Sequence, residues 1–207
     1  MHPLHSAIGG ILLSIDHPNV EIWLDAACGG KDRQIRLYGT EPVAASSCLA
    51  WVDAAIVVDG EIKVVLEIEE SNVRPLYLCG KVFATALCSY SSRGGRRTPI
   101  AASILFIQVI KLQKKAGSAK LKQCEYLEAT INQIFKKLEN RVHTYSFHYG
   151  LAEDFITGTG AQELRQEILD FMDRLAQPKT INQDSTCGTA VDSPPGLKRN
   201  RLTKPRI

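Results

Sequence analysis

The sequence predicts an α/β domain over residues 1–176, with a mixed β-sheet flanked by helices and further helices at its C-terminal end. Segments with helical periodicity alternate with short β-branched runs, the order typical of that class. Hydrophobic residues make up 44% of the 207, which is enough to bury a core. Residues 177–207 have almost nothing apolar to bury and are rich in Pro, Ser, Thr and Lys/Arg, which predicts a disordered basic tail.

The first elements expected are one helix and two short strands. Residues 3–15 place Leu and Ile at three- and four-residue spacing, which predicts an amphipathic helix. Gly9 and Gly10 weaken that prediction by about 1 kcal/mol each. Residues 20–24 and 34–38 are short apolar runs separated by turn-forming residues, which predicts two strands.

A β-hairpin is predicted next. Residues 51–58 and 61–70 are two β-branched runs around Asp59-Gly60, a dipeptide typical of tight hairpin turns. Because side chains alternate between the faces of a strand, Glu67 and Glu69 share one face. The same alternation places Ile62, Val64, Leu66 and Ile68 on the other face.

The second half of the domain continues the alternation. A helix is predicted from Pro75, which suits its first turn, through an apolar stripe that ends before the glycine and arginine cluster at 93–97. The remaining predictions are a buried strand at 102–111, a helix at 121–138, a strand at 142–149 and a helix at 160–175.

Composition predicts a cytoplasmic protein with no membrane span. No run approaches the roughly 18 apolar residues that a span needs, and the N-terminus lacks the basic region of a signal peptide. Six cysteines are scattered without a C-x-x-C pair, which is typical of reduced thiols. The tail contributes +4 to the net charge of +3, so residues 1–176 are close to neutral at −1.

The hairpin contains the residues of greatest chemical interest. Asp53 lies in an apolar run, where a carboxylate is costly unless it is paired or binds a cation. A plain two-residue turn would put Asp53 on the wrong face, so we expect a three-residue loop, Val58-Asp59-Gly60, that pairs Asp53 with Val65. Asp53, Glu67 and Glu69 would then converge and favour a hard cation such as Mg²⁺ or Mn²⁺. The alternative is that the acids only solvate the hairpin while Asp53 caps a backbone group.

These residues resemble the core of the PD-(D/E)xK nuclease superfamily, in which an Asp begins one strand of a hairpin and Glu-x-Lys lies on the next. Here the match is Asp53 followed by Glu67-Ile68-Glu69. The predicted order over residues 3–111 is similar to the αβββαβ core of those restriction-endonuclease-like proteins. Glu69 stands where lysine is usual, as in the Glu-x-Glu variant of some type II restriction endonucleases.

The resemblance implies a Mg²⁺- or Mn²⁺-dependent endonuclease that hydrolyses DNA phosphodiester bonds in a restriction or defence context. It implies Asp53 and Glu67 as metal ligands, Glu69 as a ligand or general base, and a homodimer where both strands are cut. Many members bring a Glu from the first helix, but residues 3–15 contain no acid. His5 is expected to be an ordinary surface histidine.

Cations for catalysis and for DNA come from later positions. Lys81 lies on one predicted helix face with Arg74 and Tyr77 and is expected to replace the missing lysine; the alternative is a solvated lysine whose stem covers apolar surface. Arg74, Arg96 and Arg97 are the expected nucleic-acid-binding residues. A wider cationic rim or a solvated charged face would include Lys31, Arg33, Arg36, Arg93, Lys111, Lys114 and Lys115, with Lys198-Arg199-Asn200-Arg201 as an arm or as a solubilising tail.

Two other functions stay open. The chain could be a catalytically inactive nuclease-fold module that binds nucleic acid or a protein partner, with Glu69 in the lysine position as a symptom. It could also be a small globular protein whose acidic hairpin is only a surface. Metal-dependent cleavage would distinguish an active nuclease from the inactive module. If the acidic hairpin is only a surface, metal should have no effect on the melting temperature.

Overall fold

The structure is a computed structural model that describes residues 2–39, 45–71, 74–113, 118–138 and 141–176. The chain divides into two units, Met1–Gln177 and Pro178–Ile207, and the description below concerns the first. The predicted tail with its basic arm, and also Lys114 and Lys115, lie outside the described residues.

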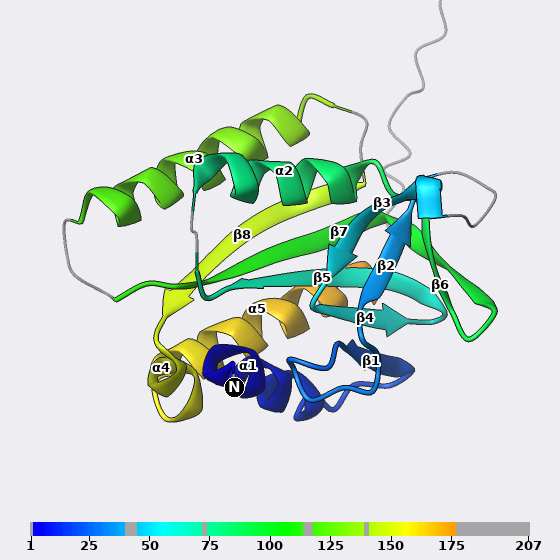
Figure 1. The fold of residues 1–207 in the computed structure, drawn as a ribbon, viewed down its shortest axis with the longest axis horizontal. Helices are drawn as coiled ribbons and strands as arrows, with labels where there is room; N and C mark the ends of the chain where they lie inside the picture. Colours follow the sequence, from blue (N-terminus) through cyan, green and yellow to red (C-terminus); the bar gives the residue numbers. More distant parts are fainter. Residues whose placement is uncertain (1, 40–44, 72–73, 114–117, 139–140, 177–207) are drawn as a thin grey trace, which may run out of the picture. The chain divides into compact units, whose positions relative to one another are not determined.

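Helices cover both faces of a central sheet (Figure 1). They are α1 Pro3–Leu13, η1 Ala45–Ser47, α2 Pro75–Ala86, α3 Ala119–Phe135, α4 Ala152–Ile156 and α5 Thr159–Ala176. In the view of Figure 1, α2 and α3 lie above the sheet, and α1, α4 and α5 lie below it. In the described part of the chain, no helix combines the length and apolarity needed to cross a membrane.

The sheet is mixed, with mostly antiparallel pairs. Its strands are β1 Val20–Leu24, β2 Ile35–Tyr38, β3 Cys48–Val52, β4 Ala54–Val58, β5 Glu61–Glu69, β6 Tyr90–Arg93, β7 Arg96–Lys111 and β8 Val142–Gly150. Their order is β1-β4-β5-β7-β6-β2-β3, with β8 also paired to β7. The β5–β7 and β7–β8 pairs are parallel, and the other pairs are antiparallel. The predicted α/β class, a mixed sheet flanked by helices, is therefore confirmed.

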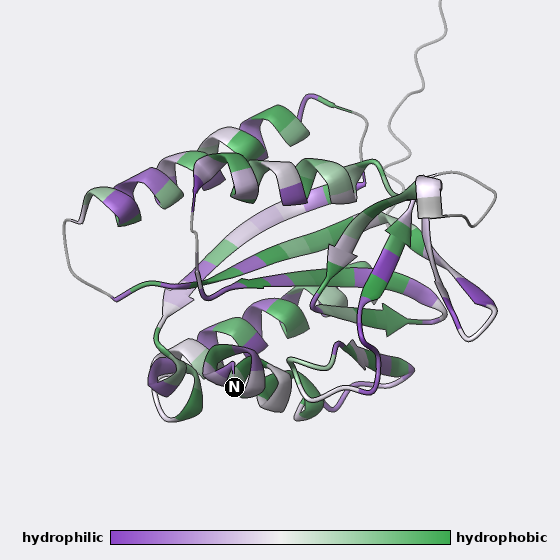
Figure 2. Cartoon of the chain, in the orientation of Figure 1, coloured by the Kyte–Doolittle hydropathy of each residue, from purple (hydrophilic) through white to green (hydrophobic). Residues whose placement is uncertain are grey.

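Each face of the sheet has its own core, and the strands between them are strongly hydrophobic (Figure 2). A fully buried Leu, Ile or Phe contributes about 1.5–3 kcal/mol, so both layers of helices are held mainly by this burial. The core above includes Leu78 and Val82 of α2 with Ile131 and Phe135 of α3. The core below includes Leu4, Ile8 and Leu12 of α1 with Leu164, Ile168 and Phe171 of α5.

The β4–β5 hairpin differs from the predicted one in its loop. Val58 pairs with Glu61, so Asp59 and Gly60 form a two-residue turn, and both have positive φ. The predicted three-residue loop is therefore wrong. A β-bulge instead places one extra residue, Lys63, in β5, because Val57 pairs with Ile62 while Ile56 pairs with Val64.

The bulge decides which side chains share a face. Ala54 lies opposite Leu66, and continuing this register by one residue places Asp53 opposite Glu67 rather than Val65. Both then lie on the face of the sheet that α2 covers. It also moves Ile62 to the core above, with Val65, so the predicted grouping of Ile62 with Val64 is wrong.

Two further strands were not predicted as such. The expected strand at 51–58 is broken at Asp53 into β3 and β4, which pair with different neighbours. Residues 90–93 form β6 and pair with the start of β7 at Arg96–Pro99, where only a turn-forming cluster was expected. Gly94 and Gly95 both have positive φ and make this turn.

Helix α1 allows a matched stability test on its two glycines. A Cβ at Gly9 would lie 2.0 Å from the carbonyl oxygen of Cys28, whereas a Cβ at Gly10 would meet nothing within 4 Å. We expect Gly9→Ala to destabilise the protein by about 1–3 kcal/mol through overpacking. Gly10→Ala should stabilise it by about 0.5–1 kcal/mol through helix propensity. Urea unfolding of both variants checks this, and two shifts of the same sign would contradict it.

Candidate functional site

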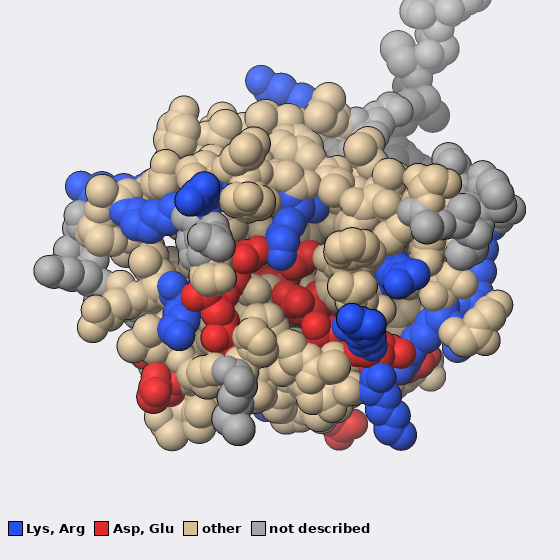
Figure 3. All heavy atoms as spheres, in the orientation of Figure 1, with Lys and Arg blue, Asp and Glu red and all other residues tan. Residues whose placement is uncertain are grey.

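A solvent-open cavity of about 520 Å³ lies between α2 and β3, and its lining includes Asp25, Asp53, Glu67 and Lys81. On this face of the molecule acidic side chains gather in a central hollow, with cationic side chains around it (Figure 3). The cavity therefore joins buried carboxylates to solvent.

Asp53 occupies the bend between β3 and β4, and its backbone is held on both sides. Its carbonyl accepts a hydrogen bond from Asp25 N–H at 2.9 Å, and its own N–H donates to Leu66 O at 3.2 Å. Its side chain is 20% exposed, and Oδ2 accepts from Ile68 N–H at 2.6 Å. These bonds fix the carboxylate at the edge of the cavity while the chain changes direction.

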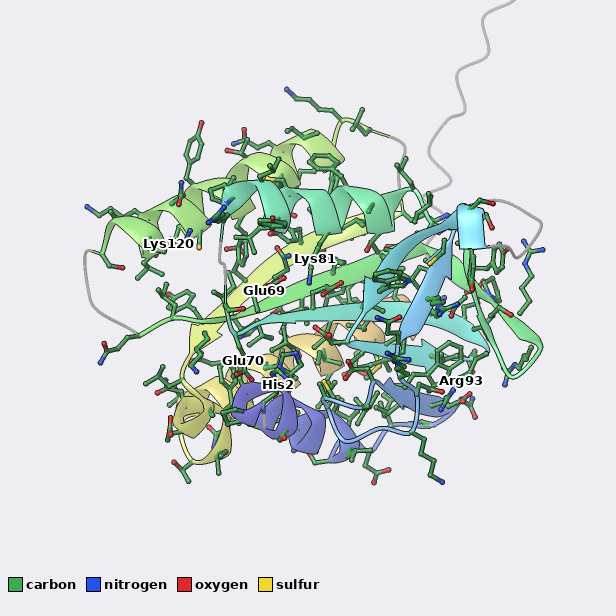
Figure 4. The ribbon with its side chains drawn as sticks, in the orientation of Figure 1. His2, Glu69, Glu70, Lys81, Arg93 and Lys120 are labelled. Atoms are coloured by element: carbon green, nitrogen blue, oxygen red, sulfur yellow. The ribbon has the colours of Figure 1, made fainter. Side chains whose placement is uncertain are left out.

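Glu67 and Glu69 reach the same lysine from neighbouring positions on one face of β5. Lys81 Nζ lies 2.6 Å from Glu67 Oε2 and 2.6 Å from Glu69 Oε1. Figure 4 shows Lys81 and Glu69 pointing toward one another from α2 and β5. The Glu67 side chain is only 2% exposed, whereas Lys81 is 35% exposed and can reach solvent.

The pKa shifts of Asp53, Glu67 and Lys81 show that carboxylates outnumber cations at this site. Burial, and then the neighbouring Asp53 carboxylate, raise the pKa of Glu67 well above its usual value despite Lys81. Burial also raises the pKa of Asp53, although Ile68 N–H, His5 and Lys81 oppose that shift. Burial lowers the pKa of Lys81, but Glu67 and Glu69 outweigh this effect and its pKa is raised. A further cation would therefore stabilise the ionised carboxylates.

His5 is buried beside these acids, so its prediction as a surface histidine is wrong. Its Nδ1 lies 3.1 Å from Glu70 Oε1, and its Nε2 lies 3.8 Å from Asp53 Oδ2. Glu70 Oε1 also accepts from Leu4 N–H at 3.0 Å, at the N-terminus of α1. Burial raises the pKa of Glu70, but hydrogen bonds from His5 and Leu4 together lower it below its usual value. Helix α1 is thus tied to the end of β5 next to Asp53.

Two sets of residues have the chemistry to hold a metal. Among the described residues, His2, His5 and Glu70 form a set of three whose ligand atoms all lie within 4.8 Å of one another. The predicted set of three carboxylates is not gathered in this way, and Lys81 Nζ lies 2.6 Å from both Glu67 and Glu69. Mg²⁺ takes one or two carboxylates and keeps several waters, and Asp53 with Glu67 supplies that kind of donor set.

A buried amide lies next to Glu67. Gln108 pairs with Glu67 in the parallel β5–β7 register, is fully buried, and is hydrogen-bonded to Tyr145 through its oxygen. Its Nε2 has no hydrogen-bond partner within the described residues.

The predicted DNA-binding arginines lie outside the cavity. Arg96 pairs with Glu21 at 3.6 Å and lies next to Gly60, at the end of β5 opposite to Glu67. The Arg97 guanidinium stacks 3.9 Å above the Tyr90 ring, and Arg74 is the exposed residue before α2. Figure 4 shows Arg93, in the same hairpin as Arg96, toward the right side of the view and away from Lys81.

Arg33 and Asp25 are the cavity residues that the sequence least revealed. Arg33 lines the cavity but appeared only in the wider cationic rim. Asp25 lies there with its Oδ1 accepting from Cys28 N–H at 2.9 Å. Asp25 directly follows the apolar run at 20–24, just as Asp53 directly precedes the apolar run at 54–58. This position at the end of an apolar run was the sign in the sequence that Asp25 could belong to the site.

Removing the charge of Glu67 should stabilise the metal-free protein. A raised pKa means that the folded state favours the protonated form, so ionised Glu67 lowers stability as pH rises through that pKa. We expect Glu67→Gln to add about 0.5–2 kcal/mol, which raises Tm by about 2–4 °C per kcal/mol. Thermal unfolding in EDTA checks this, with Glu61→Gln on the exposed part of β5 as the control. A lower Tm for Glu67→Gln would contradict it.

The contribution of Lys81 to stability should depend on the charge of Glu67. Lys81→Met leaves Glu67 buried without its main partner, and we expect a loss of about 2–4 kcal/mol, somewhat below a fully buried pair because Lys81 is partly exposed. In a Glu67→Gln background the loss should shrink by more than half. The control is Lys63→Met, which breaks an equally short but more exposed pair with Glu61 and should cost under about 1 kcal/mol. Equal losses for Lys81→Met in both backgrounds would disprove the coupling.

Comparisons with protein-family models, with curated proteins and with solved structures find no match to this chain. Its function therefore has to be argued from its own residues and their geometry.

Proposed function

We propose that this protein is a divalent-metal-dependent endonuclease that hydrolyses DNA phosphodiester bonds. One observation supports this most strongly. Asp53, in the bend before β4, and Glu67, on β5, line one solvent-open cavity, with Lys81 Nζ 2.6 Å from Glu67. Keeping the Glu67 carboxylate almost fully buried at such a place costs stability, which is typical of functional sites.

The order of elements is consistent with this proposal. Helix α1, strands β1, β4 and β5, helix α2 and strand β7 follow the αβββαβ order, and β5 runs parallel to β7. In this assignment β2, β3 and β6 are insertions, and β8, α4 and α5 are C-terminal additions. Asp53 then directly precedes the second core strand and Glu67 lies on the third, an arrangement similar to that of the PD-(D/E)xK superfamily that the sequence resembles.

Asp53 and Glu67 would hold Mg²⁺ or Mn²⁺, with water filling the remaining positions. When bound, the ion supplies Lewis-acid stabilisation of charge on the phosphate and lowers the pKa of a coordinated water. The hydrogen bond from Ile68 N–H holds Asp53 Oδ2 in place for this role.

The residues around the metal ligands have separate roles. Because its pKa is raised, Lys81 stays protonated and acts as a cation that stabilises negative charge on the phosphate, not as a base. Glu69 is the carboxylate that can accept the proton of the attacking water. The water oxygen bonds to phosphorus, the bond to the leaving oxygen breaks, and the proton passes to Glu69. A homodimer would supply the second site needed to cut both strands.

Cleavage assays test the proposal. With Mg²⁺ or Mn²⁺ we expect nicking or cutting of supercoiled and linear DNA. Asp53→Asn and Glu67→Gln should lose activity by about 10³-fold or more, and Lys81→Met by about 10²–10³-fold. Glu61→Gln should remain active. Gel assays on variants with confirmed folding measure these losses.

Two results would count against a nuclease. Cleavage that survives in Asp53→Asn and Glu67→Gln would place the activity elsewhere. No cleavage by any form, together with no rise in Tm on adding metal, would favour the inactive-module alternative.

A further inference from the structure

Four large apolar side chains are exposed around the mouth of the carboxylate cavity. Leu49 is 45% exposed, Trp51 59%, Leu76 80% and Tyr77 55%, and all four line that cavity. Single exposed apolar residues are ordinary, but a group of four rimmed by polar residues marks a binding surface. Uncharged side chains border the acidic hollow in Figure 3.

The four residues form two walls of a groove. Leu49 and Trp51 share one face of β3, and Leu76 and Tyr77 lie in the first turn of α2. Gly80 lines the space between the walls, and a Cβ there would meet nothing within 4 Å, so the groove is open.

The groove leads directly to the proposed catalytic groups. Trp51 precedes Asp53 by two residues, and both line the same cavity. Tyr77 lies one helical turn before Lys81. A planar group held between Trp51 and Tyr77 would therefore place its neighbouring atoms beside the carboxylates.

Cations lie next to these aromatic side chains. Arg33 lines the same cavity, and Arg36 is exposed and pairs with Trp51 across the β2–β3 ladder. Aromatic faces interleaved with arginines are how proteins hold single-stranded nucleic acid, with bases stacked on rings and phosphates on cations. In a duplex the base faces are covered by neighbouring base pairs and cannot reach a protein ring.

We infer that the groove between α2 and β3 binds the bases of an unpaired DNA strand, with Trp51 and Tyr77 as stacking surfaces. This rests on the proposed nuclease function and narrows its substrate to single-stranded or locally unpaired DNA. Trp51 and Tyr77 are specificity-determining residues, and Arg33 and Arg36 bind the adjoining phosphates.

Tryptophan fluorescence of the full chain in EDTA tests the inference without requiring cleavage. The chain has two tryptophans, and Trp23 is 1% exposed, so a change on adding DNA reports Trp51. The probes are a short oligo(dT) and a duplex of equal length. We expect oligo(dT) to quench the emission and to bind more tightly than the duplex.

Variants then identify the surface. Trp51→Ala and Tyr77→Ala should each weaken oligo(dT) binding by about 5- to 150-fold, measured by anisotropy of labelled DNA. Gly80→Leu should weaken it by filling the groove, in a substitution that favours the helix. Trp51→Phe should keep most of the affinity. Tyr126→Ala, which removes a 70% exposed tyrosine outside the cavity, should change nothing.

Three results would overturn the inference. The first is equal quenching and affinity for duplex and oligo(dT). The second is unchanged oligo(dT) binding by Trp51→Ala and Gly80→Leu. The third is a fluorescence change that depends on protein concentration without DNA, which would show that a second copy covers the groove. Stacking without metal-dependent cleavage would instead refute the nuclease and leave the groove assignment standing.

Discussion

The extra residue in β5 is the constraint on which the rest of the site depends. With one residue more or fewer between the turn and Glu67, the Glu67 side chain would point toward α1 and α5, into a cluster of buried hydrophobic residues. The bulge at Lys63 keeps Glu67 and Glu69 on the side of α2, where Lys81 is. A change of register in one hairpin therefore decides whether a polar site exists between two hydrophobic layers.

That site extends further into the sheet than its carboxylates. Glu67 lies beside Gln108 of β7, and Gln108 contacts Tyr145 of β8, so polar groups cross three neighbouring strands. Burying them is costly unless they are satisfied, and Glu67 is only partly compensated by Lys81. The hydrophobic burial on both faces supplies the stability that lets the fold tolerate this polar row.

Much of the fold could be predicted because periodicity reports burial. Helix α1, strands β1 and β5 and helix α5 were located to within a few residues from their apolar spacing. The faces on which the hairpin side chains lie could not be predicted, because a run of β-branched residues looks the same in the sequence with or without a bulge. The break at Asp53 was also hidden, because residues 51–58 are apolar on both sides of it. His5 shows the same limit: its burial results from contacts with Glu70 and Asp53, which are distant in the sequence.

The bend at Asp53 couples the shape of the cavity to its chemistry. Strand β3 forms one wall of the groove, but it pairs with β2 at the far side of the sheet and is joined to β4 through Asp53 itself. The wall of the groove and the carboxylate at its end are therefore consecutive parts of one segment of the chain, and a substitution in β3 can alter both.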